Sequence, residues 1–196
     1  MAWDELDRLD PEDVCRRSSA AYAPESATFR LTVFGQPVLL SKTERLVSAA
    51  TSAGERLLET LGPHLRLSAL WYLKGARDLP LSGRLVKPDD LAGGDIYRRG
   101  THVLPLDKVA GRYGRDPAAF LERGMELGGE RLDYADASLR LFPLPRVPVA
   151  MLLWVGDDEF QARAGLLFDS TCQLHLPVDV LWSTAMMSVL AFAAQV

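Results

Sequence analysis

Alternating apolar and polar positions predict an antiparallel hairpin in each half of the chain. Residues 28–33 alternate, residues 35–37 have turn composition, and residues 38–40 are apolar again, which is typical of two strands joined by a short turn. In the C-terminal half, residues 147–155 are apolar on both faces, and residues 163–168 can return antiparallel to them across a charged turn.

Helix-start signals precede several segments in which apolar residues recur with helical spacing. Asp10-Pro11 and Asp116-Pro117 each combine an N-cap residue with a proline at the first helical position. The first helix is expected to end at Tyr22-Ala23-Pro24. Residues 41–44, Ser-Lys-Thr-Glu, resemble a capping box and predict a helix that continues to the stop signal Gly62-Pro63. Further helices are expected over residues 64–76, over residues 106–113, and from Pro177 onward.

The order of these elements indicates an α+β fold. Helices precede and follow the strands, the C-terminal strands are adjacent in sequence, and no strand–helix–strand signature of a parallel sheet occurs. We therefore expect a single globular domain over residues 1–196. In it, the C-terminal hairpin and the N-terminal hairpin form a small, mostly antiparallel sheet that packs against several helices.

One long passage lacks strong periodicity. Residues 79–94 are rich in Gly and Pro and have room for one short strand near Leu85-Val86. Long irregular segments in compact domains are often functional loops or lids, so Gly93-Gly94 is a candidate site, although a plain surface loop explains it as well.

Composition narrows the function classes. The chain has 196 residues, of which 48% are hydrophobic and 24% charged, with a net charge of −4, so one core is expected and a nucleic-acid partner is not. Because no window of ~18 uninterrupted apolar residues occurs and the N-terminus is acidic, we expect a soluble, cytoplasmic protein without a membrane partner. Two cysteines, Cys15 and Cys172, argue against a disulfide framework, and any four-cysteine iron–sulfur cluster would have to be on another protein.

The charged turn of the C-terminal hairpin is the first candidate for chemistry. Asp157, Asp158 and Glu159 place three carboxylates together, and such a cluster could bind a hard cation. It lacks the ligand spacing of a calcium loop, and a charged hairpin turn explains it more simply. Alternatively, one of these acids faces inward with Arg146 as its counter-charge.

A thiol and an imidazole follow that hairpin. Cys172 and His175 have a spacing found in transition-metal sites, and Asp169 precedes them. In an extended chain an i,i+3 pair points to opposite faces, so only a turn would bring the two together. A buried free thiol and a histidine near a helix start is the favoured interpretation.

Six motifs are spread over the chain: Leu81-Ser82-Gly83, Gly93-Gly94-x-x-Tyr97, Pro145-Arg146-x-Pro148, Trp154-x-Gly156-Asp157-x-Glu159-Phe160, Leu167-Phe168-Asp169 and His175-Leu176-Pro177. Together they resemble an uncharacterised family of bacteria and archaea, many of them anaerobes, known as domain of unknown function 3786. The resemblance implies little about function, because the family has no established reaction. Some relatives look like fusions to a small four-cysteine iron–sulfur domain, which points to anaerobic redox or one-carbon metabolism and to an iron–sulfur or corrinoid protein as partner. This chain has no such cysteine-rich segment.

We expect a non-catalytic accessory or binding protein, with a pocket between the C-terminal sheet and residues 83–97 that holds a small molecule, cofactor or partner segment. No cofactor can be named. One alternative is an enzyme, either a metal-assisted hydrolase or another activity, that requires Asp157, Glu159, Asp169 and His175 to converge. Another alternative is a pure protein-interaction module. Arg146, Asp157, Glu159 and Asp169 could instead form a buried ion-pair network. The candidate ligand-binding residues are Gly93, Gly94, Tyr97, Arg146, Trp154, Asp157, Glu159, Asp169 and His175.

Overall fold

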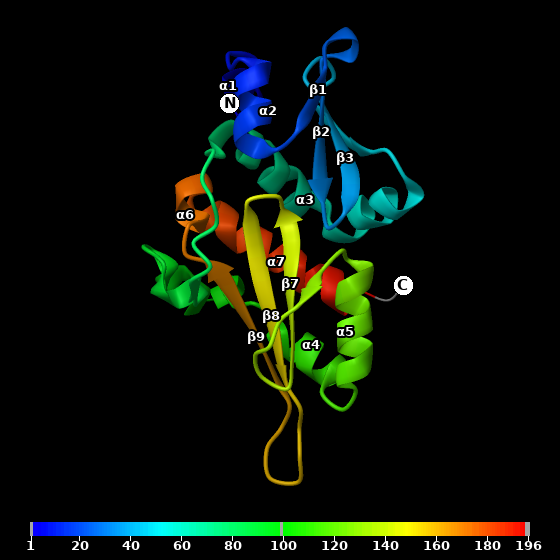
Figure 1. Ribbon diagram of the computed structural model, residues 1–196, viewed down its shortest axis with the longest axis vertical. Helices are drawn as coiled ribbons and strands as arrows, with labels where there is room; N and C mark the ends of the chain where they lie inside the picture. The colour runs from blue at the N-terminus through cyan, green and yellow to red at the C-terminus, as the bar shows by residue number, and fades with distance from the viewer. Residues whose placement is uncertain (1, 99, 195–196) are drawn as a thin grey trace.

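The computed structural model describes residues 2–98 and 100–194, and it confirms the α+β class. Two antiparallel sheets follow one another along the long axis of the molecule (Figure 1). The N-terminal half comprises α1 (Ala2–Asp7), α2 (Pro11–Ser18), β1 (Ala21–Ala23), β2 (Thr28–Val33), β3 (Gln36–Ser41), β4 (Leu46–Ala49) and α3 (Ser52–Gly75). The C-terminal half comprises β5 (Leu85–Val86), α4 (Leu106–Tyr113), α5 (Pro117–Glu126), β6 (Glu130–Arg131), β7 (Ala137–Leu144), β8 (Val147–Trp154), β9 (Arg163–Asp169), α6 (Cys172–His175) and α7 (Val178–Ala193).

The two predicted hairpins form, but they lie in separate sheets. The strand orders are β1-β2-β3-β4 and β5-β9-β8-β7-β6. Other strands occupy the edges of each hairpin: β1 and β4 pair with β2 and β3, while β5 and β7 pair with β9 and β8. The sheets meet at the β2–β3 turn, where Phe34 and Gly35 both have positive φ (48° and 73°), as a two-residue turn requires. The Phe34 N–H donates to the Phe142 carbonyl at 3.0 Å.

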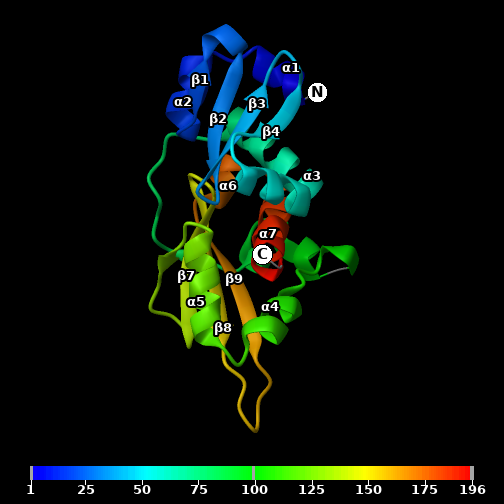
Figure 2. The ribbon, with the colours of Figure 1, turned by 90° about the vertical axis from the view of Figure 1, so that its right-hand side faces the viewer.

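Helices cover the sheets and connect their cores. α3 packs against β3 and β4, while α4, α5 and α7 contact the strands of the C-terminal sheet (Figure 2). α3 and α7 also pack against each other. The buried cluster runs from the N-terminal sheet through α3 to the C-terminal sheet and α7, and its members include the fully buried Leu31, Tyr72, Met151 and Phe192.

The helix predicted from Ser41 begins later, and this prediction was wrong. The Ser41 hydroxyl does accept a hydrogen bond from the Glu44 N–H at 3.2 Å, but it closes a turn instead of starting a helix. Residues 46–49 then pair with β3 as β4. Thr51 is the actual N-cap of α3 and accepts from the Gly54 N–H. Pairing with an open sheet edge outweighs a local capping pattern here.

One other helix boundary differs from the prediction, and one is confirmed. α2 ends at Ser18 and not at Tyr22, because residues 21–23 pair with β2. The predicted stop at Gly62-Pro63 is confirmed as a break within α3: Gly62 has the non-helical angles φ 49° and ψ −123°, and two helical segments meet there at a kink. Proline removes a helical hydrogen bond, and its ring clashes with the preceding turn.

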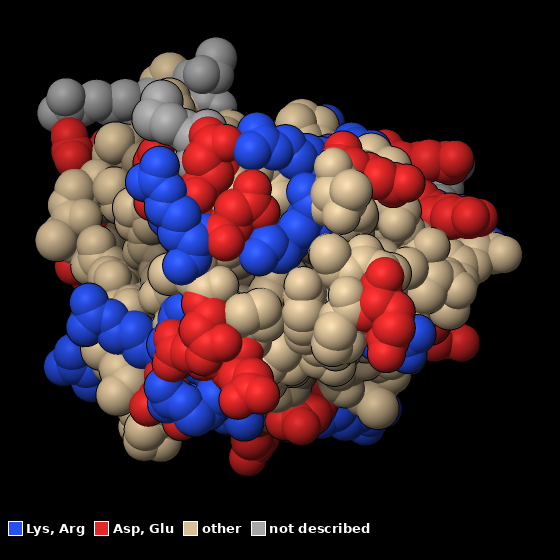
Figure 3. Space-filling model, turned by 90° about the horizontal axis from the view of Figure 1, so that it is seen from above, with Lys and Arg blue, Asp and Glu red and all other residues tan. Residues whose placement is uncertain are grey.

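Charged side chains at the end of the molecule that carries α1 and α2 lie next to partners of opposite sign (Figure 3). Arg45 pairs with Asp4 at 2.6 Å and with Asp7 at 3.3 Å, and Lys74 pairs with Glu5 at 2.8 Å. In the described ranges, every helix is too short or too polar to cross a membrane.

Candidate functional site

Asp169, at the end of β9, uses both carboxylate oxygens to hold neighbouring backbone. Oδ1 accepts from the N–H and hydroxyl of Ser82 (3.2 and 2.9 Å) and from the N–H and hydroxyl of Thr171 (3.0 and 2.7 Å), and Oδ2 accepts from the Gly83 N–H (2.8 Å). Burial opposes ionisation, but these hydrogen bonds outweigh it and hold the pKa of Asp169 below its usual value. The side chain is 3% exposed. Asp169 is therefore a turn anchor, a carboxylate that fixes the backbone N–H groups of Ser82, Gly83 and Thr171.

His175 holds the same irregular segment nearer to its start, at Arg77. Its Nδ1 accepts from the Arg77 N–H at 3.2 Å, so the ring proton lies on Nε2. Nε2 is buried and has no partner within the described part of the chain. Burial, followed by the nearby charges of Arg146 and Arg77, lowers the pKa of His175, which keeps the imidazole neutral at pH 7.

Arg146, in the β7–β8 turn, is the third residue that holds this segment. Its Nη1 donates to the Leu79 carbonyl at 3.1 Å and its Nη2 to the Asp78 carboxylate at 2.7 Å. Its own N–H donates to the Tyr72 hydroxyl at 3.1 Å. Arg146, Asp169 and His175 therefore attach residues 77–83, the coil that descends from α3 in Figure 1, to the C-terminal half.

The acidic turn lies far from these three residues. The Asp157 carboxylate accepts from the N–H groups of Phe160 (2.7 Å) and Glu159 (2.9 Å), and these bonds lower the pKa of Asp157. Glu159 is exposed. The connection projects beyond the body of the protein in Figure 1, whereas Asp169 lies at the opposite end of β9. With seven residues in β9 and about 3.3 Å per residue, the strand ends are roughly 20 Å apart.

This separation corrects two predictions. Asp157 and Glu159 do not converge with Asp169 and His175, so the set required for a metal-assisted hydrolase does not form. The predicted ion-pair network does not form either, because Arg146 lies at the other end of β8 and pairs with Asp78. Among residues 2–98 and 100–194, no three His, Cys, Asp or Glu side chains are placed to hold a metal ion.

Gly93, Gly94 and Tyr97 belong to a compact segment packed near the start of α7. Gly93 has φ +77° and its position faces Val178, and a Cβ at Gly94 would lie 2.2 Å from the Pro88 carbonyl oxygen. Tyr97 is 5% exposed, and burial raises its pKa. A Cβ at either glycine would lie against Val178 or the Pro88 carbonyl, so close packing by itself explains why both residues are glycine.

A cavity of about 220 Å³ lies between the Gly83 end of the predicted loop and the C-terminal sheet. Gly93, Gly94 and Tyr97 do not line it, and neither does Trp154, which lies along β8 with its ring over Gly165 and under the Arg163 guanidinium (4.3 Å). The carboxylate at its wall, Asp169, is fully engaged by the protein. The lining residues are Leu81, Ser82, Gly83, Leu85, Arg140, Pro148, Val149, Ala150 and Asp169.

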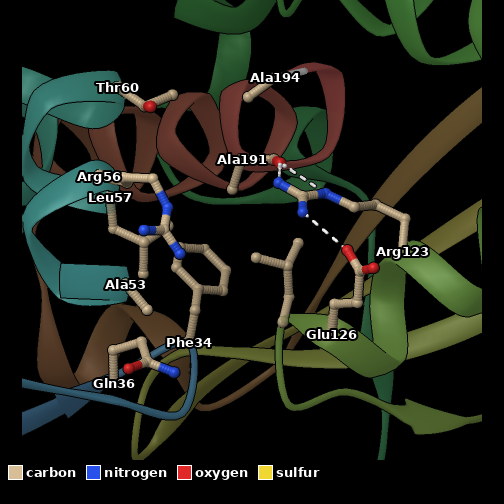
Figure 4. Close-up of a pocket in the computed structure, with 11 residues that line it drawn as sticks. Phe34, Gln36, Ala53, Arg56, Leu57, Thr60, Arg123, Glu126, Ala191 and Ala194 are labelled. Carbon is tan, nitrogen blue, oxygen red and sulfur yellow. Dashed lines mark hydrogen bonds and ion pairs between the residues drawn. The ribbon is translucent and has the colours of Figure 1, made fainter. Parts of the chain in front are cut away.

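A second cavity, of about 250 Å³, lies where the two halves meet (Figure 4). The ring of Phe34, from the β2–β3 turn, points into it between α3 on one side and α5 on the other. Four distant parts of the sequence therefore form its walls. The lining residues are Phe34, Gln36, Ala53, Arg56, Leu57, Thr60, Arg123, Glu126, Leu127, Ala191 and Ala194.

The two arginines of this cavity have different environments. Arg123, from α5, donates through Nε and Nη2 to the Ala191 carbonyl (3.2 and 2.7 Å) and through Nη1 to Glu126 (2.9 Å). Arg56, from α3, extends beside the Phe34 ring (Figure 4). No hydrogen bond or ion pair joins Arg56 to any residue in the described ranges.

Sequence reasoning missed this cavity. Ala53, Arg56, Leu57 and Thr60 do share one helical face by their i, i+3, i+4 and i+7 spacing, but that pattern indicates only a partly buried helix. Phe34 precedes a glycine in a turn, which also gave no indication of a ligand. The cavity depends on the docking of the β2–β3 turn against α5, and no local pattern encodes that contact.

Comparison with known proteins gives a family but no activity. No curated protein and no solved structure matches this chain. A model of the family described as domain of unknown function (DUF3786) matches residues 10–191, which is most of the chain. The protein therefore belongs to the DUF3786 family.

Proposed function

We propose that this protein is a non-catalytic binding protein and that the Figure 4 cavity holds a small molecule. One observation carries the proposal: the apolar side chains of Phe34, Leu57 and Leu127 line the same cavity as several polar groups. Ligand sites in proteins combine a mostly apolar lining with a few placed polar groups. Phe34 is 1% exposed and Leu127 5%, so these two side chains are also part of the core.

The other cavity, of about 220 Å³ beside Gly83 and the C-terminal sheet, supports a ligand less well. Its carboxylate, Asp169, already accepts hydrogen bonds from Ser82, Gly83 and Thr171, and its arginine, Arg140, lies 3.5 Å from Glu130. A ligand there would have to compete with the protein for these groups. The Figure 4 cavity has a guanidinium that no protein group uses.

The other functions considered have less support. A metal-assisted hydrolase needs carboxylates and an imidazole at one point, and Asp157 and Glu159 are separated from Asp169 and His175 by the length of β9. A pure interaction module needs a continuous apolar patch, whereas exposed apolar side chains such as Leu46, Met125 and Phe160 come from separate elements. An accessory role beside an iron–sulfur or corrinoid protein, and a cytoplasmic location, stay predictions from the family resemblance and the composition.

The test is a ligand-observed NMR screen of small aromatic and aliphatic fragments against the full chain. Ala53→Leu should abolish binding, because a larger side chain at this wall fills the cavity without lowering helix propensity. Ala118→Leu, at an exposed position of α5, is the matched control and should bind as the wild type does. If no fragment binds, or if Ala53→Leu binds fragments as well as the control, this cavity is not a ligand site.

A further inference from the structure

The structure also points to the class of ligand: we infer that the Figure 4 cavity takes a small organic anion, with an apolar body on Phe34 and a carboxylate on Arg56. This inference rests on the proposed function, because it assumes that the cavity is occupied. It adds a charge requirement that the cavity alone does not impose.

The free guanidinium of Arg56 is the main observation. Arg56 is exposed, and other exposed arginines such as Arg66 and Arg84 also have side chains without a partner in the described ranges. Arg56 differs from these two because its side chain lines the cavity. Arg56 has Glu59 three positions along α3, a spacing at which helical ion pairs form. The pair does not form in this structure, and the side chain extends along the cavity beside Phe34 instead.

The other polar groups of the cavity lining favour a ligand that accepts hydrogen bonds. The Gln36 carbonyl oxygen accepts from the Thr51 hydroxyl at 3.0 Å, which leaves its amide N–H group as a donor. The only carboxylate of the lining, Glu126, is held by Arg123. Two arginines and one glutamate give the lining a net charge of +1 (2 − 1). A carboxylate matches a guanidinium in charge and in its two-point hydrogen-bond geometry.

The size of the cavity limits the apolar part. A dry protein cavity of about 150 Å³ can hold benzene, so the 250 Å³ here has room for one ring or a branched chain together with its carboxylate. The Phe34 ring and the side chains of Leu57 and Leu127 supply the complementary apolar surface. A larger cofactor such as a dinucleotide or a corrinoid would not fit within this volume.

The experiment measures binding of two probes of similar shape, phenylacetate and its neutral analogue phenylacetamide, by isothermal titration calorimetry or NMR on the full chain. Phenylacetate should bind about tenfold more tightly than phenylacetamide, because hydrogen bonds to charged groups are the stronger ones. Arg56→Gln should remove this preference and leave phenylacetamide binding unchanged. Arg66→Gln, at an exposed position on the same helix, is the matched control and should retain it.

The outcomes separate this inference from the proposed function. If both probes bind equally, or if Arg56→Gln leaves the preference intact, the anion requirement is wrong while the cavity stays a ligand site. If neither probe binds and the fragment screen is also negative, the proposed function itself fails. Inorganic phosphate, which lacks an apolar body, should bind at least about tenfold more weakly than phenylacetate. Equal binding of phosphate would overturn the need for the apolar body.

Discussion

Replacing Asp169 distinguishes a turn anchor from a ligand-binding acid. In Asp169→Asn, an amide oxygen at the Oδ1 position can keep the hydrogen bonds from Ser82 and Thr171, but the NH₂ group then faces the Gly83 N–H at a position where the carboxylate accepts at 2.8 Å. One charge-assisted hydrogen bond is lost. The expected loss in the free energy of unfolding is about 1.5–3 kcal/mol.

Asp169→Ala removes every acceptor at this site. The N–H groups of Ser82, Gly83 and Thr171 and the hydroxyls of Ser82 and Thr171 lose this acceptor, although the Ser82 hydroxyl keeps its contact with the Ser170 hydroxyl. Separate penalties of about 1–3 kcal/mol each would overshoot, because groups that share one partner are not additive and some will find water. We expect a total loss of about 3–5 kcal/mol, as for breaking other buried charged interactions.

Urea unfolding at pH 7, followed by tryptophan fluorescence, measures both variants against the wild type. The slope m should stay constant while the midpoint falls, and the amides of residues 82 and 83 should lose protection from hydrogen exchange. Asp158→Ala, in the exposed turn, is the control and should change stability by less than about 0.5 kcal/mol. A loss below about 1 kcal/mol for Asp169→Ala would refute the anchor role, since an acid kept for a ligand costs little to remove.

Three further predictions concern stability. Burial lowers the folded-state pKa of His175 and of His64. The free energy of unfolding should therefore be highest above the unfolded-state histidine pKa, near ~6.5, and should fall as the pH drops below that value. His175→Gln should reduce this fall in urea titrations between pH 7.5 and 5.5, and an unchanged fall would contradict the role of His175. Gly94→Ala should destabilise the fold by about 1–3 kcal/mol, because the new Cβ would meet the Pro88 carbonyl. Gly111→Ala, in open space on α4, should stabilise the fold by about 0.5–1 kcal/mol. Thermal melts that rank the two variants in the opposite order would contradict the steric argument. If residues 1–196 are one domain, calorimetry should show a single transition with equal calorimetric and van't Hoff enthalpies, and two separated transitions would refute it.

Local chemistry in the sequence determined much of the secondary structure. Asp10 and Asp116 do cap α2 and α5, each followed by a proline, because a cap needs only a side-chain oxygen and the next few N–H groups. The hairpins were also predictable, since period-2 patterns and short turns are local properties. The family resemblance, carried by motifs across the chain, is confirmed over residues 10–191.

Patterns compatible with two local structures were decided by tertiary contacts. Ser41 and Glu44 suit a capping box and a turn equally well, and the open edge of β3 selected the turn by pairing with β4. The separation of the hairpins into two sheets was likewise decided by strand pairing, because β1 and β4 flank one hairpin and β5 and β7 flank the other.

The candidate site shows the same division. The sequence indicated that Arg146, Asp169 and His175 are special, but only the structure shows that all three hold residues 77–83 and that Asp157 bonds to its own turn. The Figure 4 cavity could not be predicted at all. Phe34, Arg56 and Arg123 are far apart in sequence, and they come together only because the β2–β3 turn docks between α3 and α5. Strands and caps follow from neighbouring residues, whereas a cavity is set by long-range packing, which no local pattern records.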